Sequence, residues 1–142
     1  MESAVGHNLY LLLTSYKDVE GMLSLESVNS ETLEKIDEKI VDIYGYSMSV
    51  DSILGNDSLH NVANKFRKVL SEIQNNQPAN NQSQGYGKIK DMLQEWRGII
   101  GATYYDKSDI EGGKAKLENN DFSNVESFEK RIEDYYQGII KK

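Results

Sequence analysis

The sequence predicts an all-α protein, an antiparallel bundle of four to five helices, from two observations. Five stretches space their apolar residues alternately three and four positions apart, which places those residues on one face of a helix. Each such face must be covered by another helix or by a partner. The second observation is the length, because 142 residues can bury a substantial core without a disulfide or a metal. Residues 1–142 are therefore predicted to form a single domain.

The apolar stripes are interrupted by only two polar residues, Ser47 and Thr103. We expect the stripes to form the core of the bundle. In chain order they are Val5, Leu9, Leu12, Tyr16, Val19 and Leu23; Leu33, Ile36, Ile40, Ile43, Ser47, Val50 and Leu54; Leu59, Val62, Phe66, Val69 and Ile73; Ile89, Met92, Trp96, Ile99 and Thr103; and Val125, Phe128, Ile132, Tyr135 and Ile139.

Turn signals separate the first three helices, which we expect over residues 3–25, 30–54 and 58–75. Asn29 or Ser30 is placed to cap the second helix, because such side chains accept hydrogen bonds from the free N–H groups of the first turn. Gly55 supplies a glycine stop, and the two polar residues after it supply a cap for the third helix. So short a connection makes the second and third helices antiparallel neighbours.

Residues 75–87 are predicted to be a mobile polar loop. The stretch is rich in asparagine and glutamine, contains Pro78, the only proline, and has almost nothing to bury. It is expected to join a first half of three helices to a second half of two, over residues 88–105 and 123–140. Ser123 and Glu126 match the capping box that begins many helices, so we expect them to start the last one.

The charge of the chain disfavours one class of partner. Acidic residues outnumber basic ones by 23 to 16, for a formal net charge of −7, so binding to a phosphate backbone would work against the overall field. We therefore expect no nucleic acid partner. The longest apolar run, residues 9–13, is far too short to cross a bilayer, so we expect a soluble cytoplasmic chain without membrane insertion.

No catalytic, cofactor-binding or metal-ligating residue is predicted. His7 and His60 lie in different helices, and neither has a histidine or a carboxylate four residues away. The Glu-x-x-His pairs of di-iron bundles are absent, and residues 106–117 do not fit the register of a calcium loop. We therefore expect no cofactor and no enzymatic activity.

The nine tyrosines are the unusual part of the composition, because tyrosine is enriched at protein interfaces. Our candidate partner-binding patch lies where two of them precede an acidic segment. A further tyrosine, Tyr44, shares a second stripe with Val41 and Met48, and there we expect core packing. The residues of the candidate patch are Tyr104, Tyr105, Asp106, Asp109 and Glu111.

Two short motifs resemble those of the small helical-hairpin proteins handled by type VII secretion. Residues 96–98 spell Trp-x-Gly, and residues 105–109 spell the Tyr-x-x-x-Asp export signal. That family places Trp-x-Gly in the turn of a hairpin, whereas here Trp96 is expected inside a helix. The chain departs from the family pattern at this point, and we do not assign the family.

These observations favour a non-enzymatic protein–protein interaction module, such as an immunity protein, a phage or mobile-element inhibitor, or a secretion accessory. The partner would be another protein, and the acidic charge suits a basic one. A homodimer is a second option, because the stripe over residues 33–54 also fits a dimer seam. The alternative function is a ligand-sensing helical domain of a membrane receptor, which would place the chain outside the cytoplasm.

Overall fold

A computed structural model describes residues 2–24, 28–76, 79–105 and 114–141 of the chain. The described part contains five helices, and no β-strand is assigned within it. The helices are α1 (Glu2–Leu23), α2 (Ser30–Leu54), α3 (Ser58–Asn76), α4 (Ala79–Tyr104) and α5 (Ser123–Ile140). The predicted all-α fold is confirmed.

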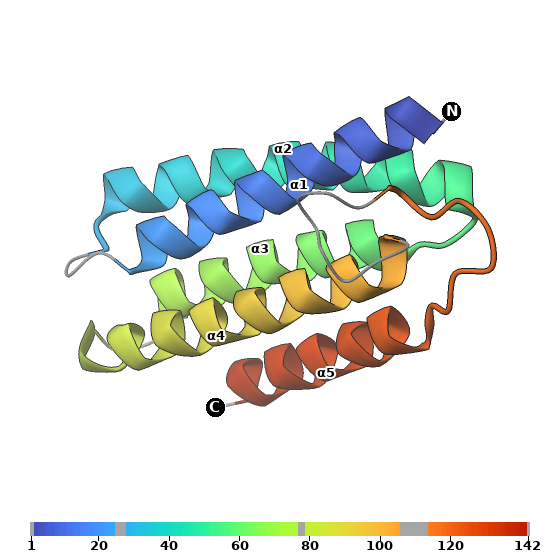
Figure 1. Cartoon of the computed structure of the whole chain (residues 1–142). Coiled ribbons are helices and arrows are strands. Elements are labelled where there is room, and N and C mark those ends of the chain that lie inside the picture. The colour runs from blue at the N-terminus through green and yellow to red at the C-terminus, as the bar shows by residue number, and fades with distance from the viewer. Residues whose placement is uncertain (1, 25–27, 77–78, 106–113, 142) are drawn as a thin grey trace.

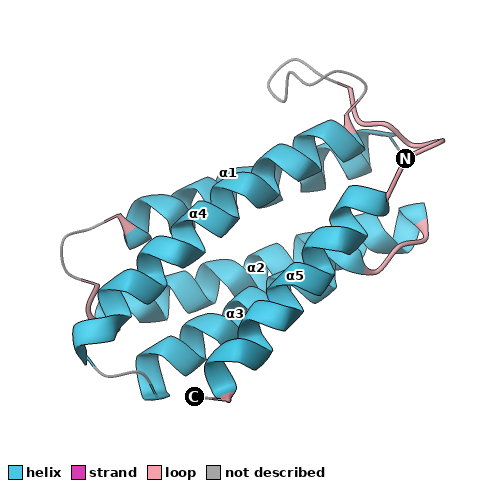
Figure 2. Ribbon diagram, turned by 90° about the horizontal axis from the view of Figure 1, so that it is seen from below, coloured by secondary structure: helices cyan, strands magenta, loops and turns pink. Residues whose placement is uncertain are grey.

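The helices form two layers with α5 beneath them (Figure 1). α1 and α2 lie side by side over α3 and α4, and α5 packs against α3 and α4 on the side away from α1 and α2. Successive helices run in opposite directions, so α5 lies parallel to α3, as the view from below shows (Figure 2). The predicted antiparallel bundle is therefore confirmed, and α3 becomes a wall shared by α2, α4 and α5.

Aromatic side chains from four helices meet in the core. Trp96 of α4 stacks on Phe128 of α5 with their ring centroids 4.7 Å apart, and Phe66 of α3 lies 6.1 Å from Phe128. Tyr16 of α1 meets Phe66 edge to face at 6.0 Å, and its hydroxyl accepts a hydrogen bond of 3.3 Å from the Trp96 indole. Offset and edge-to-face contacts are the favoured aromatic geometries. They connect α1, α3, α4 and α5 through buried residues of the predicted stripes.

The predicted caps of α2 and α3 are present. Asn29 accepts a hydrogen bond of 2.9 Å from the backbone N–H of Thr32 at the start of α2. Gly55 ends α2 in the left-handed conformation, with φ of 73°, which glycine adopts without a steric penalty. Asn56 then accepts a hydrogen bond of 2.7 Å from the backbone N–H of Ser58 in the first turn of α3. The turn between α2 and α3 fixes them as antiparallel neighbours.

The structure corrects the predicted bounds of the loop at residues 75–87. α3 continues through Asn76 and α4 begins at Ala79, so helix occupies most of that stretch, while residues 77 and 78 lie outside the described part. Packing explains the extra turns of α4. Tyr86 is buried, and Gly85 lies so close to Ile73 that a Cβ there would meet the Ile73 side chain at 3.0 Å. A polar segment can therefore be helical when a few of its residues dock on a neighbouring helix.

The structure also corrects the predicted cap of α5. The helix covers the predicted range, but Phe122 holds the capping position and makes no side-chain hydrogen bond there. Instead of the capping box between Ser123 and Glu126, Asp121 accepts a hydrogen bond of 3.0 Å from the backbone N–H of Ser123. The carboxylate of Asp121 thus accepts the Ser123 N–H hydrogen bond that the motif predicts for Glu126.

Candidate functional site

The predicted patch around Tyr104 and Tyr105 is not a surface of exposed tyrosines. Tyr104 is fully buried and Tyr105 is 7% exposed, while residues 106, 109 and 111 lie outside the described part of the chain. Described residues that follow α4 lie against both tyrosines, and Tyr105 forms an isolated β-bridge with Ala115. Tyr104 lies against Phe122, with ring centroids 5.9 Å apart, and its carbonyl accepts a hydrogen bond of 2.8 Å from the N–H of Lys116. Both rings are therefore covered, and binding of a partner by this patch stays a prediction.

A different apolar surface is exposed on α2. Val41, Tyr44 and Met48 are 46%, 38% and 44% exposed, and we name these three residues the α2 face. The expectation that Tyr44 packs in the core is wrong. The main stripe of α2 already faces α1 and α3, and no other helix of the described part contacts α2. The second stripe therefore stays open to solvent.

The α2 face lies along the edge where α2 meets α3. The ring of Tyr44 stands edge to face on His60 of α3, with centroids 5.7 Å apart and planes at 87°. One turn before Val41, the carboxylate of Asp37 accepts two hydrogen bonds, of 2.7 and 3.2 Å, from Arg67 of α3. Because residues three and four apart share a helix face, Asp37 and the α2 face form one continuous line beside α3.

A surface groove continues from this line toward the N-terminal end of α2. It has a volume of about 330 Å³ and lies between α2 and α3. Its apolar lining comes from both helices and its rim is polar or charged. We name it the α2–α3 groove; its lining residues are Ser30, Leu33, Glu34, Ile36, Asp37, Ile40, Arg67, Leu70, Ser71 and Gln74.

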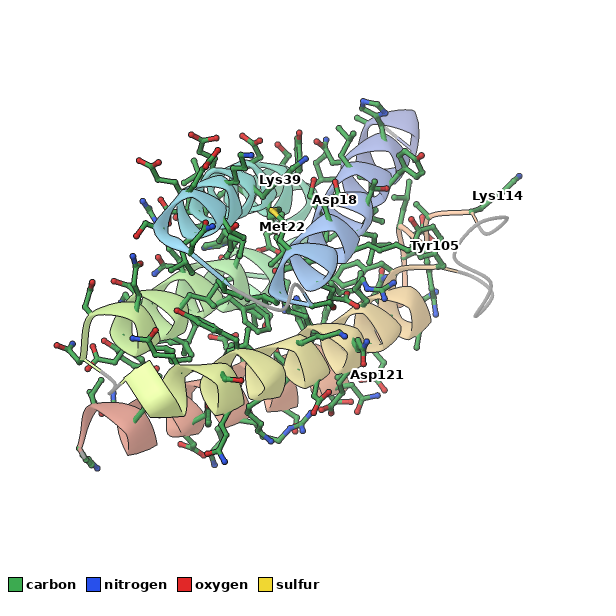
Figure 3. The ribbon with its side chains drawn as sticks, turned by 90° about the vertical axis from the view of Figure 1, so that its left-hand side faces the viewer. Asp18, Met22, Lys39, Tyr105, Lys114 and Asp121 are labelled. Atoms are coloured by element: carbon green, nitrogen blue, oxygen red, sulfur yellow. The ribbon has the colours of Figure 1, made fainter. Side chains whose placement is uncertain are left out.

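Three exposed carboxylates follow one another along α2: Glu34 lines the groove, and Glu38 and Asp42 lie further along the helix. Glu34, Glu38 and Asp42 are spaced four residues apart, and none forms an ion pair with a residue that the structure describes. The two lysines of α2 are engaged elsewhere. Lys35 pairs with Glu31 at 3.6 Å, and Lys39 pairs with Asp18 of α1 at 3.3 Å. Figure 3 shows Lys39 beside α1, near Asp18 and Met22. We name Glu34, Glu38 and Asp42 the acidic rim.

A buried acid contacts His60, the residue that Tyr44 meets edge to face. Asp51 is 3% exposed, and its Oδ2 atom accepts a hydrogen bond of 2.9 Å from the backbone N–H of His60 and lies 2.7 Å from His60 Nδ1. Its other oxygen has no partner among the described residues, nor have the buried hydroxyls of Ser47 and Tyr104. Burial raises the pKa of Asp51 to about 6, although the hydrogen bonds to His60 act in the opposite direction.

Sequence reasoning missed the contact between Asp51 and His60. The two residues lie on different helices, nine positions apart, and their approach depends on the tight turn at Gly55. The polar Ser47 within an apolar stripe was the available signal, because it lies one turn before Asp51 on the same helix face.

The remaining hollows are polar or shallow. One lies between α3 and α5 and is lined by asparagine, lysine and glutamate side chains. Another, between α1 and α2, surrounds the Asp18–Lys39 pair. Within the described ranges, no group of three or more histidine and carboxylate side chains is arranged to hold a metal ion.

Comparisons with protein-family models, curated proteins and solved structures found no match to this chain. Among the residues that the structure describes, no helix is both long and apolar enough to span a membrane.

Proposed function

We propose that this protein is a non-enzymatic module that binds another protein through the α2 face. The observation that carries the proposal is the exposure of three large apolar side chains on successive turns of one helix. Exposed apolar residues scattered singly are common on protein surfaces, whereas a contiguous group is typical of an interaction site. Covering the α2 face with a partner would remove this apolar surface from water.

Tyr44 supports the proposal as the central contact of the α2 face. Its ring rests edge to face on His60, a favoured aromatic geometry that holds the ring in place on the surface of α3. A large side chain that is already ordered loses little conformational entropy on binding. Tyrosine is also among the residue types that contribute most to the binding energy of protein interfaces.

Site-specific photo-crosslinking in the native host tests the proposal. A benzophenone amino acid is placed at position 44 or 48, and at position 130 as a control, because Lys130 is exposed on α5 away from the α2 face. We expect one protein to be crosslinked from positions 44 and 48 and not from position 130. The purified partner should then bind the unmodified chain, and Tyr44→Ser should weaken the measured Kd.

Two results would overturn the proposal. One is the absence of any adduct from positions 44 and 48 while the control variants remain folded and abundant. The other is a partner whose Kd is the same for the unmodified chain and for Tyr44→Ser.

A further inference from the structure

We infer that the partner contributes a basic amphipathic helix, which lies along the α2–α3 groove and the α2 face with its cationic side chains toward the acidic rim. This inference rests on the proposed protein-binding function and adds the chemistry and the shape of the partner segment. Three properties of the surface support it: its length, its exposed apolar side chains and its charge.

The surface has the length of a short helix. It begins at Leu33 in the groove and ends at Met48 on the α2 face. At a rise of 1.5 Å for each residue, this part of α2 extends about 22 Å, which corresponds to about four turns of a partner helix. The groove and the α2 face are adjacent, because Asp37, which pairs with Arg67, lines the groove and Val41 lies one turn further on.

The apolar side of a helix would rest on Leu33 and on the α2 face. Leu33 is partly exposed in the groove, whereas Ile36, Ile40 and Leu70 also line it but are almost fully buried. Two adjacent helices present a groove into which a third helix can pack with side chains spaced three and four residues apart. The α2 face repeats the same spacing, so a single helical partner can contact both parts of the surface.

The charge of the rim selects a cationic partner. Glu34, Glu38 and Asp42 lie one turn apart and have no ion pair within the described part of the chain. On the α3 wall, Arg67 is already paired with Asp37, and the other groove residues there are uncharged. Lysine or arginine side chains on successive turns of a partner helix would therefore meet three free carboxylates.

The same rim disfavours a second copy of this chain as the occupant. A twofold interface would bring the same surface patch of both copies together, and hence two acidic rims. Each copy also carries a formal net charge of −7. Like charges that face one another across an interface weaken association.

Defined synthetic peptides test the inference with the full-length chain. The first peptide is about four turns long, with leucines at three-four spacing and lysines beside them. The second has glutamate in place of lysine, and the third has a central proline that breaks the helix. We expect the first peptide to bind with a Kd about tenfold lower than either control, as judged from three ion pairs and helix formation. NMR shifts should then map to α2 between residues 33 and 48.

A charge-neutral variant of the rim provides the matched test on the protein. The triple substitution Glu34→Gln, Glu38→Gln and Asp42→Asn keeps the shape of the surface and should raise the Kd for the lysine peptide about tenfold. The same change of charge on α5, Glu126→Gln, Glu129→Gln and Asp134→Asn, should leave that Kd unchanged.

The outcomes separate this inference from the proposed function. Equal binding of the three peptides, or NMR shifts confined to α5, would overturn the inference. A protein crosslinked from positions 44 and 48 through an acidic or non-helical segment would also overturn it, while leaving the protein-binding function intact. Self-association abolished by Met48→Glu, with no other protein crosslinked, would overturn both.

Discussion

Two surface grooves border α3, and they differ in how far their polar side chains are paired with one another. The α2–α3 groove is lined by four apolar residues as well as polar and charged ones, and it lies next to the exposed α2 face. The groove on the other side of α3, which we name the α3–α5 groove, has a volume of about 490 Å³ and a polar lining. Its lining residues are Asn61, Asn64, Lys65, Glu126, Glu129, Lys130 and Glu133.

Polar groups of the α3–α5 groove pair with one another across the two helices. Asn61 donates a hydrogen bond of 3.1 Å to Glu129, and Lys65 forms an ion pair with Glu133. On the α2–α3 side, the Asp37–Arg67 pair crosses the groove, while the acidic rim has no ion pair within the described part. A hollow alone does not mark a binding site. A better marker is a group of apolar and charged side chains that the fold leaves without partners.

The strongest influence on stability should come from Asp51, the buried acid that contacts His60. The folded chain holds the proton on Asp51 up to a pKa of about 6, whereas its ordinary value is 3.8. The folded state therefore binds more protons between these values, and the free energy of unfolding falls as the pH rises through this window. Asp51→Asn cannot ionise, so above pH 6 we expect its free energy of unfolding to exceed that of the unmodified chain by up to about 3 kcal/mol. Urea unfolding followed by circular dichroism from pH 4 to pH 8 measures this difference.

An exposed acid on the same helix is the control for Asp51→Asn. Asp42→Asn should change the free energy of unfolding by less than about 0.5 kcal/mol at every pH. A lower stability of Asp51→Asn at pH 8 would contradict the prediction, because it would show that the charged carboxylate stabilises the fold through His60.

Substitutions on the two sides of α3 should affect the Kd for the partner differently. Tyr44→Ala should weaken binding of the crosslinked partner by about 2 kcal/mol, roughly 30-fold in Kd, because it removes the central ring of the α2 face. Lys130→Ala in the α3–α5 groove should leave the Kd unchanged. Isothermal titration calorimetry measures both values, and the comparison between the grooves is wrong if the lysine substitution has the larger effect.

The third effect is the salt dependence of binding. Added salt screens the attraction between the acidic rim and a basic partner, so the Kd should rise with ionic strength. Glu38→Gln together with Asp42→Asn should reduce this dependence and cost about 1 kcal/mol of binding free energy at low salt. Titrations at low and high ionic strength test it, with Glu129→Gln as the variant expected to keep the original salt dependence.

The smallest effect is expected within the α3–α5 groove. Lys65 lowers the pKa of Glu133, so the pair stabilises the fold at neutral pH and this contribution is lost as the pH falls through the lowered pKa. Because the Glu133 side chain is 42% exposed, Glu133→Gln should lower the free energy of unfolding by less than about 1 kcal/mol. Urea unfolding at neutral pH measures it, and a loss several times larger would show that this groove is a major source of stability.

The spacing of apolar residues predicts the five helices and most of the core, because this property depends on each helix alone. Ile36, Ile40 and Ile43 are buried as the spacing requires. The spacing does not show how many neighbours a helix has. Val41, Tyr44 and Met48 therefore read as a second core stripe although no helix of the described part covers them.

The other differences arise from contacts between segments that are distant in sequence. Tyr104 is buried where Phe122 and the backbone of Lys116 pack against it, and local composition carries no signal of these contacts. The first turns of α4 form because Gly85 docks on Ile73 of α3. The Asp51–His60 contact requires α2 and α3 to meet in one particular register. Each depends on how elements pack rather than on which elements form.

The stack of Trp96 on Phe128 makes the intrinsic fluorescence of the protein a reporter of one location. Trp96 is the only tryptophan, and it touches α5 through Phe128 and α1 through the hydroxyl of Tyr16. If α5 separates from the bundle while the other helices stay packed, the indole emission will shift to longer wavelength while most of the helical signal remains. Coincident optical transitions would instead show that α5 and the other four helices melt as one cooperative unit.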